Sequence, residues 1–184
     1  MSSSTETSGE GIRHWYLGFI VALASATLSI ETLQATRLGL LMLEAEKKLI
    51  EYVLLHVRVY VIDVSWNTFI AYRPGGPVLT IIITPSCSGI YAVTAFLALS
   101  LSLPFIDVRR KLYALLIYAP IILLANIVRI VTSVALAMAF GPSLFGLVHN
   151  ILGSAAIILL YSVLWLDWLY RSLQHRSSRL GRLR

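Results

Sequence analysis

Four long apolar runs, separated by short polar or Pro/Gly-rich stretches, are the feature that most constrains this chain. They cover residues 15–30, 86–103, 112–140 and 148–169. A helix of about 18–20 apolar residues is long enough to cross the hydrocarbon core of a bilayer. With 58% hydrophobic and 13% charged residues, the composition is also far from that of a soluble domain. The sequence therefore predicts an all-α integral membrane protein with about five or six transmembrane helices.

Charge and cysteine content exclude other classes of protein. The net charge of +6 comes from basic residues at the chain ends and in short loops rather than from one continuous stripe, so no nucleic-acid partner is expected. Cys87 is the one cysteine of the sequence, which excludes an internal disulfide and a cysteine-based metal site. We expect no metal ion and no organic cofactor.

The chain divides into three parts by composition. Residues 1–13 are polar and without apolar period, which predicts a disordered lead. Residues 14–170 form a single transmembrane domain, and residues 171–184 form a basic cytoplasmic tail with five arginines. The run at 15–30 is interpreted as a retained span. Its small residues at 22–24 leave a cleaved signal peptide as the alternative.

Residues 33–84 carry two different patterns. Residues 33–63 mix apolar stretches with charges, which predicts an amphipathic interfacial helix leading into a span near residues 49–64. From residue 65 the apolar period becomes two, and residues 73–77 read Arg-Pro-Gly-Gly-Pro, a dense turn signal. We expect a small extracytoplasmic β-hairpin here.

The basic residues predict the orientation in the membrane. Three lie at residues 109–111, five in the tail, and three before residue 49 (Arg37, Lys47 and Lys48), which is eleven of fifteen. Basic loops face the cytoplasm. The hairpin and the helix starts near residues 86 and 148 are then expected outside.

Three polar residues stand out within the apolar background. Cys87 lies in the first turn of a helix predicted to start outside, and His149 lies at the start of the last run. Arg129 follows Lys111 by 18 residues, or about 27 Å of helix, which brings it to the same outer level. The sequence therefore predicts that a thiol, a guanidinium and an imidazole meet in one site of a multi-pass cell-membrane protein.

These groups suit acyl transfer through a thioester. A thiol attacks as its thiolate, and a helix N-terminus and a nearby cation favour that form. An arginine at membrane depth is a candidate functional residue, and His149 can accept the thiol proton and return it to a leaving amine. The N–H groups of Ser88 and Gly89, together with Arg129, are candidates for stabilising an oxyanion.

The residue that orients His149 is left open by the sequence. Asn126 and Asn150 are the two candidates, because each lies close in sequence to one of the proposed catalytic residues.

Three motifs carry a resemblance to a known family. Pro-Ser-Cys-Ser-Gly-Ile at residues 85–90, Asn-Ile-Val-Arg-Ile at 126–130 and the His that opens the last span occur in this order. The chain resembles the exosortase/archaeosortase family of membrane-embedded cysteine transpeptidases, over about residues 66–169. The resemblance implies that Cys87 is the nucleophile, that Arg129 stabilises the reacting carbonyl and that His149 fills the third site.

The resemblance also implies a substrate class. The expected partners are exported proteins that end in a signature motif, a transmembrane helix and a basic cluster. The cut chain would pass to an acceptor, for which a membrane lipid is a candidate. The chain is shorter than many relatives. Two alternatives remain open: an intramembrane protease that hydrolyses, and a non-catalytic transporter subunit or assembly scaffold.

Overall fold

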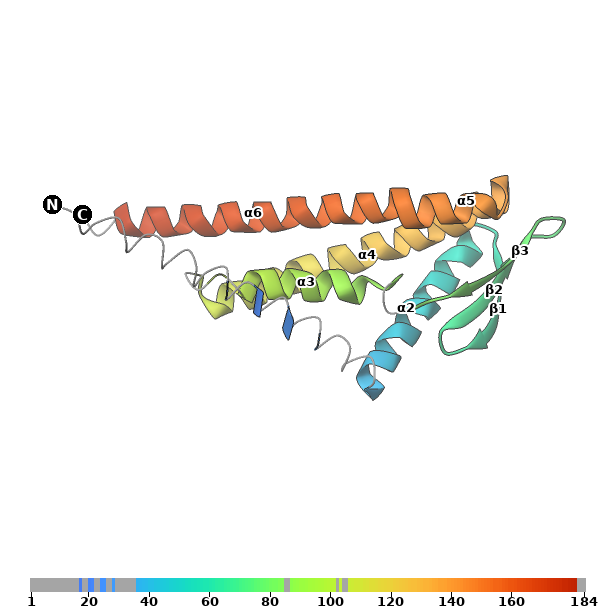
Figure 1. The fold of residues 1–184 in the computed structure, drawn as a ribbon, viewed down its shortest axis with the longest axis horizontal. Coiled ribbons are helices and arrows are strands. Elements are labelled where there is room, and N and C mark those ends of the chain that lie inside the picture. Colours follow the sequence, from blue (N-terminus) through green and yellow to red (C-terminus); the bar gives the residue numbers. More distant parts are fainter. Residues whose placement is uncertain are drawn as a thin grey trace.

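The computed structural model describes residues 17, 20–21, 24–25, 28, 36–84, 87–101, 103 and 106–181. A short helix, α2 (Arg37–His56), leads into a small sheet, and the chain then runs through α3 (Gly89–Leu101) and α4 (Val108–Phe140). It returns through α5 (Ser143–Gly146), the π-helical turn η2 (Leu147–Gly153) and α6 (Ser154–Gly181). Figure 1 shows α4 and α6 side by side, with the sheet at the end where α5 lies.

Local sequence signals place the ends of α2 and α4. The hydroxyl oxygen of Thr36 accepts a hydrogen bond from the N–H of Gly39 at 3.3 Å, which caps the first turn of α2. Gly141 follows α4 with a φ of +107°, a conformation that favours glycine, and its N–H donates to the oxygen of Ala137 at 2.9 Å. The predicted break at Gly141 and Pro142 is confirmed.

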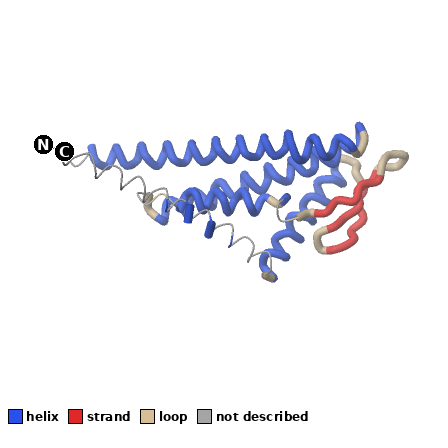
Figure 2. The backbone as a smooth tube through the Cα atoms, viewed as in Figure 1, coloured by secondary structure: helices blue, strands red, loops and turns tan. Residues whose placement is uncertain are grey.

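The sheet contains three antiparallel strands in the order β1 (Tyr60–Ser65), β2 (Thr68–Tyr72) and β3 (Val78–Ile82). Figure 2 shows these strands grouped at one end of the helices. The predicted hairpin corresponds to β2 and β3, but the prediction missed β1. The predicted span near residues 49–64 is wrong, because α2 ends at His56 and the next residues form β1, whose outer positions stay exposed.

Two buried apolar clusters hold the fold together. One lies between the inner face of the sheet, α2 and α4, and it includes Phe69, Leu54 and Val134. The other lies between α3, α4 and α6, with Phe96 and Trp168 ring centroids 6.0 Å apart. The first cluster fixes the sheet against the end of α4 at which the candidate site lies.

Two helices of the described chain are long and apolar enough to cross a membrane: α4 and the continuous helical stretch Ser143–Gln174. The apolar helix α3 is shorter than a typical span, at 13 residues. The predicted count of five or six spans is therefore not confirmed, and the predicted small β-hairpin is part of a three-stranded sheet. The predicted lead at 1–13 lies outside the described residues, as does most of the predicted span at 15–30.

The membrane orientation predicted from the basic residues also needs correction in part. Lys47 is 1% exposed, and its ammonium group pairs with the carboxylate of Asp63 in β1. Lys48 pairs with the same carboxylate. These two lysines therefore lie beside the sheet, not at the end of α4 where residues 109–111 lie. Their charges are balanced locally, so they do not mark the cytoplasmic side.

Candidate active site

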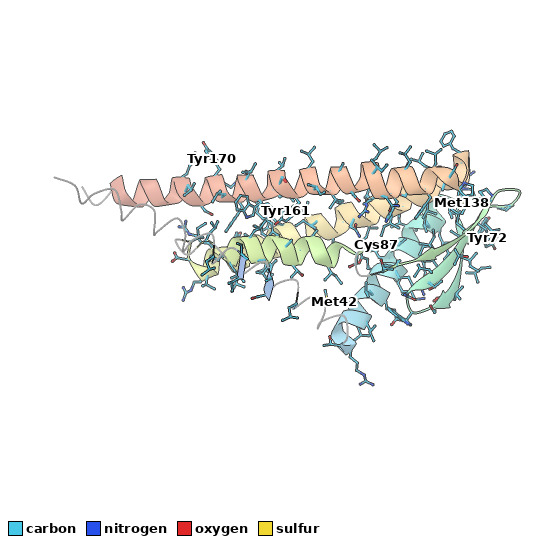
Figure 3. The ribbon with its side chains drawn as sticks, viewed as in Figure 1. Met42, Tyr72, Cys87, Met138, Tyr161 and Tyr170 are labelled. Carbon is cyan, nitrogen blue, oxygen red and sulfur yellow. The ribbon has the colours of Figure 1, made fainter. Side chains whose placement is uncertain are left out.

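Cys87 lies in a turn immediately before α3, where Figure 3 labels it between α2, α3 and the sheet. The N–H groups of Cys87 and Ser88 both donate to the backbone oxygen of Thr84, at 2.9 and 3.2 Å. The Thr84 hydroxyl donates to the Cys87 sulfur at 3.2 Å. The thiol is half-buried. The turn thus fixes the sulfur at the junction between β3 and α3.

Asn126 connects this turn to α4. Its amide Nδ2 donates to the backbone oxygen of Cys87 at 2.8 Å and to Oε1 of Glu46 at 2.8 Å. The side chain is 2% exposed. A buried amide that lost these acceptors would cost about 1–3 kcal/mol per unsatisfied group. Asn126 therefore holds the backbone that carries the thiol.

Glu46 of α2 completes this contact, and sequence reasoning missed it. Its Oε1 also accepts from the N–H of Gly89 at 3.2 Å. Burial raises the pKa of the Glu46 carboxyl above its ordinary value, while the hydrogen bonds from Asn126 and Gly89 act in the opposite direction. Among the described residues its Oε2 has no hydrogen-bond partner. A buried carboxylate in a mixed charged segment has no motif of its own, so only the tertiary contact identifies it.

Gly89 allows α3 and α4 to approach at the site. A Cβ at this position would lie 2.9 Å from Cδ2 and 3.2 Å from Cα of Leu123 in α4. Such distances are too short for any larger residue without a shift of the backbone. The glycine therefore keeps Cys87 close to Asn126.

Arg129 lies one turn beyond Asn126 and reaches the last long helix. Its Nη2 donates to the backbone oxygen of His149 at 3.0 Å and to Oγ of Ser154 at 3.1 Å, and its Nε donates to the same His149 oxygen at 3.3 Å. Its Nη1 donates to Oδ1 of Asn126 at 3.3 Å. No carboxylate of the described residues lies within ion-pair distance of this guanidinium. Among the described residues, the hydrogen-bond partners of the guanidinium are neutral groups, so its positive charge remains available for an anion.

His149 faces Arg129 through its side chain as well. Nε2 of the imidazole lies 3.4 Å from Nη2 of Arg129, and the ring stacks on Phe145 at 5.1 Å with an 8° interplanar angle. A guanidinium only donates, so Nε2 is the acceptor in this contact. The ring is buried, and in the described chain its Nδ1 has no partner.

The π-helical turn η2 explains how the guanidinium reaches the backbone of the neighbouring helix. A π-turn displaces the regular hydrogen-bond ladder and often occurs at functional sites. Gly153 ends this turn, and a Cβ there would lie 2.8 Å from Cγ and 2.9 Å from Nε of Arg129. The missing side chain provides the space that Arg129 occupies.

A small cavity of about 170 Å³ lies between β3 and η2. Cys87, His149 and Asn150 line it together with residues of β3. Arg129 borders a second, apolar groove of about 510 Å³ between α4 and α6. The structure therefore places Cys87 and His149 on one cavity and puts the imidazole in contact with Arg129, which does not line that cavity.

Two predicted supporting roles are not supported by the geometry. The N–H groups of Ser88 and Gly89 already donate to Thr84 and Glu46, so neither points to an oxyanion in this conformation. Asn126 positions the Cys87 backbone and Arg129 rather than His149.

Asn150 is exposed and lines the cavity beside His149. No hydrogen bond from its side chain to the imidazole is found, so it does not orient His149 here. Within the described part of the chain, no cluster of three or more His, Cys, Asp or Glu side chains is arranged to hold a metal ion.

Comparison with known protein families shows the family to which the chain belongs. The model of the transmembrane exosortase family (Exosortase_EpsH) matches residues 19–166. The chain belongs to this family. The match covers most of the 184 residues and confirms the resemblance that the three motifs indicated. Comparisons with curated proteins and with solved structures gave no match. This exosortase is therefore a membrane protein of a transpeptidase-like family.

Proposed function

We propose that this exosortase is a cysteine transpeptidase that cuts the C-terminal sorting signals of exported proteins. The observation that carries the proposal is the shared cavity of Cys87 and His149, with Arg129 in contact with the imidazole. The substrates are proteins with a tail of signature motif, transmembrane helix and basic cluster. This substrate class rests on the family to which the chain belongs.

The reaction proceeds in two acyl-transfer steps. The Cys87 sulfur attacks the scissile carbonyl while His149 takes the thiol proton, and Arg129 stabilises the oxyanion. The C–N bond then breaks, the amine leaves with the proton from His149, and a thioester remains on Cys87. An acceptor nucleophile attacks the thioester, its proton passes to His149, and the thiol is restored.

Arg129 is the oxyanion group in this proposal, because the single N–H groups of Ser88 and Gly89 are engaged, whereas Nη1 of Arg129 carries a second N–H beyond the one that bonds to Asn126. Its Nη1 and Nη2 bond to neutral acceptors at 3.0–3.4 Å, which fixes the planar group without neutralising it. A preorganised cation in a site of low dielectric stabilises developing negative charge strongly. Lysine would not reproduce the fork of donors.

The outer edge of β3 supports a peptide substrate. The N–H of Ile83 donates to the backbone oxygen of Asn67, directly before β2, at 2.8 Å, so alternate residues of β3 direct their backbone groups toward β2. Thr80 and Ile82 then direct theirs to the free edge, and both residues line the cavity with Cys87. An extended peptide can add to such an edge by backbone hydrogen bonds. We place the signature motif along this edge, which leads its carbonyl groups toward the thiol.

The apolar groove between α4 and α6 supports a lipid as the acceptor. Its walls are almost entirely apolar, and Arg129 and Gly153 lie on it. An alkyl chain in this groove would bring its polar end to the thioester. The end of the molecule that carries the sheet and Cys87 faces the extracytoplasmic side, because the opposite end carries Arg109, Arg110 and Lys111.

The experiment follows an exported reporter with a tripartite tail from a secreted protein of the same genome. Cys87→Ala and Cys87→Ser should abolish processing while the enzyme still inserts, and Arg129→Lys should be severely impaired. A membrane-impermeant thiol reagent should label Cys87 from outside intact cells. Full processing by Cys87→Ala would overturn the proposal. Mass spectrometry of the new C-terminus separates a lipid adduct from simple hydrolysis.

A further inference from the structure

A second large cavity lies at the end of the helices opposite the sheet. Its volume is about 660 Å³, and it lies between the first turns of α4 and the C-terminal half of α6. Basic, aromatic and apolar side chains line it, among them Arg109, Arg110, Tyr113, Ile117, Trp168 and Arg171. Tyr170 is adjacent to Arg171 in sequence, and Figure 3 shows it far from Cys87. The proposed reaction uses none of these residues.

The mouth of this cavity is positively charged. In the described chain, neither Arg109 nor Arg110 has a carboxylate within ion-pair distance. The carboxylate of Asp167 is occupied on both oxygens, by Nε of Arg171 at 2.9 Å and by the hydroxyl of Tyr118 at 2.7 Å. One carboxylate therefore faces three guanidinium groups, and two of these have no internal counter-charge.

The walls become apolar along α4, away from the arginines. One face of α4 forms this wall, because the cavity is lined by residues at helical spacing: Arg110, Ala114 and Ile117. Ala114 and Trp168 form a floor that is 3% and 5% exposed. A ligand that fits must therefore have an anionic group at one end and an alkyl chain that runs toward the middle of the membrane.

We propose that this cavity is a binding site for an anionic phospholipid of the membrane leaflet next to it. Arg109 and Arg110 bind the phosphate, and an acyl chain lies against Ile117 and Trp168. Basic pockets between transmembrane helices are suited to anionic headgroups. The lipid would join α4 to α6 at the end where the hydroxyl of Tyr118 donates a hydrogen bond to Asp167.

The test uses the full-length protein in detergent with equal amounts of phosphatidylglycerol and phosphatidylcholine. Native mass spectrometry should show selective retention of phosphatidylglycerol. The double variant Arg109→Gln/Arg110→Gln should lower its affinity by about thirtyfold, since each basic side chain near an anionic lipid contributes about a fivefold factor. Arg37→Gln, which removes an exposed arginine at the start of α2, should leave retention unchanged.

A second pair of variants tests the acyl-chain wall without changing the charge. Ile117→Trp should fill the cavity and lower retention, whereas Leu116→Trp, at a neighbouring side chain that is 75% exposed and does not line the cavity, should not. Inorganic phosphate at millimolar concentration should not displace the lipid. Equal effects of the two tryptophans, displacement by phosphate, or equal effects of Arg37→Gln and the double variant would overturn the proposal. None of these readouts depends on tail cleavage, so the result stands apart from the transpeptidase proposal.

Discussion

The amide nitrogen of Asn126 donates a hydrogen bond to the backbone oxygen of Cys87 at 2.8 Å, which joins the middle of α4 to the turn that carries the thiol. The same side chain accepts from Arg129, at 3.3 Å. One buried amide therefore positions both the proposed nucleophile and the proposed oxyanion group. The geometry of the site depends on this residue more than on any contact between the sulfur and the guanidinium.

Replacing the Asn126 amide by an acceptor should damage the site. Asn126→Asp places a carboxylate against the Cys87 oxygen and against Glu46, so it loses two hydrogen bonds and adds repulsion. We expect a loss of about 2–4 kcal/mol in the free energy of unfolding and no detectable tail processing. Thermal unfolding in detergent measures the first. Asn150→Asp is the control, because its side chain is exposed, and it should unfold like the wild type.

A methyl group at residue 153 should displace Arg129. The Cβ of Gly153→Ala would lie within 3 Å of two Arg129 atoms. Overpacking of this kind costs about 1–3 kcal/mol, and processing should fall in parallel with the loss of the Arg129–His149 contact. Gly146→Ala is the matched control, because no atom lies within 4 Å of its Cβ. If both alanine variants process the reporter equally, Gly153 is not needed to position the arginine.

Stability should depend on the ionisation of Glu46. Because burial raises its pKa in the folded state, the protonated form is favoured by folding. Its contribution is fully present below the ordinary carboxyl value of about 4.3 and is lost as pH rises through the raised pKa. The unfolding midpoint of Glu46→Gln should therefore rise relative to that of the wild type as pH increases from about 4.3 through the raised pKa. Glu44→Gln, at an exposed position two residues earlier, should show no such trend.

The edge of β3 should tolerate proline at one position and not at the next. Thr80→Pro removes an N–H that faces the free edge, so the sheet should persist while processing of the tail is lost. Thr80→Val keeps the N–H and should process normally. Leu79→Pro removes an N–H that bonds to β2 and should disrupt the sheet. Normal processing by Thr80→Pro would exclude the edge as the peptide site.

The long elements and the three polar residues could be predicted because each carries a local signal. The apolar run ending at Gly141 and Pro142 gives α4 directly, and helical rise alone places Arg129 at the level of Cys87. The turn at residues 73–77 predicts the strands on either side of it. In these cases short-range sequence spacing determines the structure.

The other features of the fold and site depend on tertiary contacts, which the spacing of residues in the sequence does not show. The apolar residues of β1 predict part of a span, whereas the structure leaves the outer face of this strand exposed. The sequence pattern favours a surface position for Lys47, whereas in the structure this side chain is buried and pairs with Asp63. Glu46 becomes part of the site only through Asn126, which is 80 residues away. The π-turn that lets Arg129 reach the His149 oxygen has no recognised sequence pattern.

The side chain of Lys111 donates a hydrogen bond to the backbone oxygen of Leu101, which joins the end of α3 to the first turn of α4. It puts the end of α3 level with Lys111, and Asn126, which holds the Cys87 turn, follows Lys111 by fifteen residues, or at most about 22 Å along α4. The hydrocarbon core is about 30 Å thick. The Cys87 turn therefore lies about 22 Å from Lys111 along α4, a distance shorter than the thickness of that core. In the proposed reaction, a substrate that is anchored in the lipid by its own transmembrane helix would bring its scissile bond to the level of the thiol.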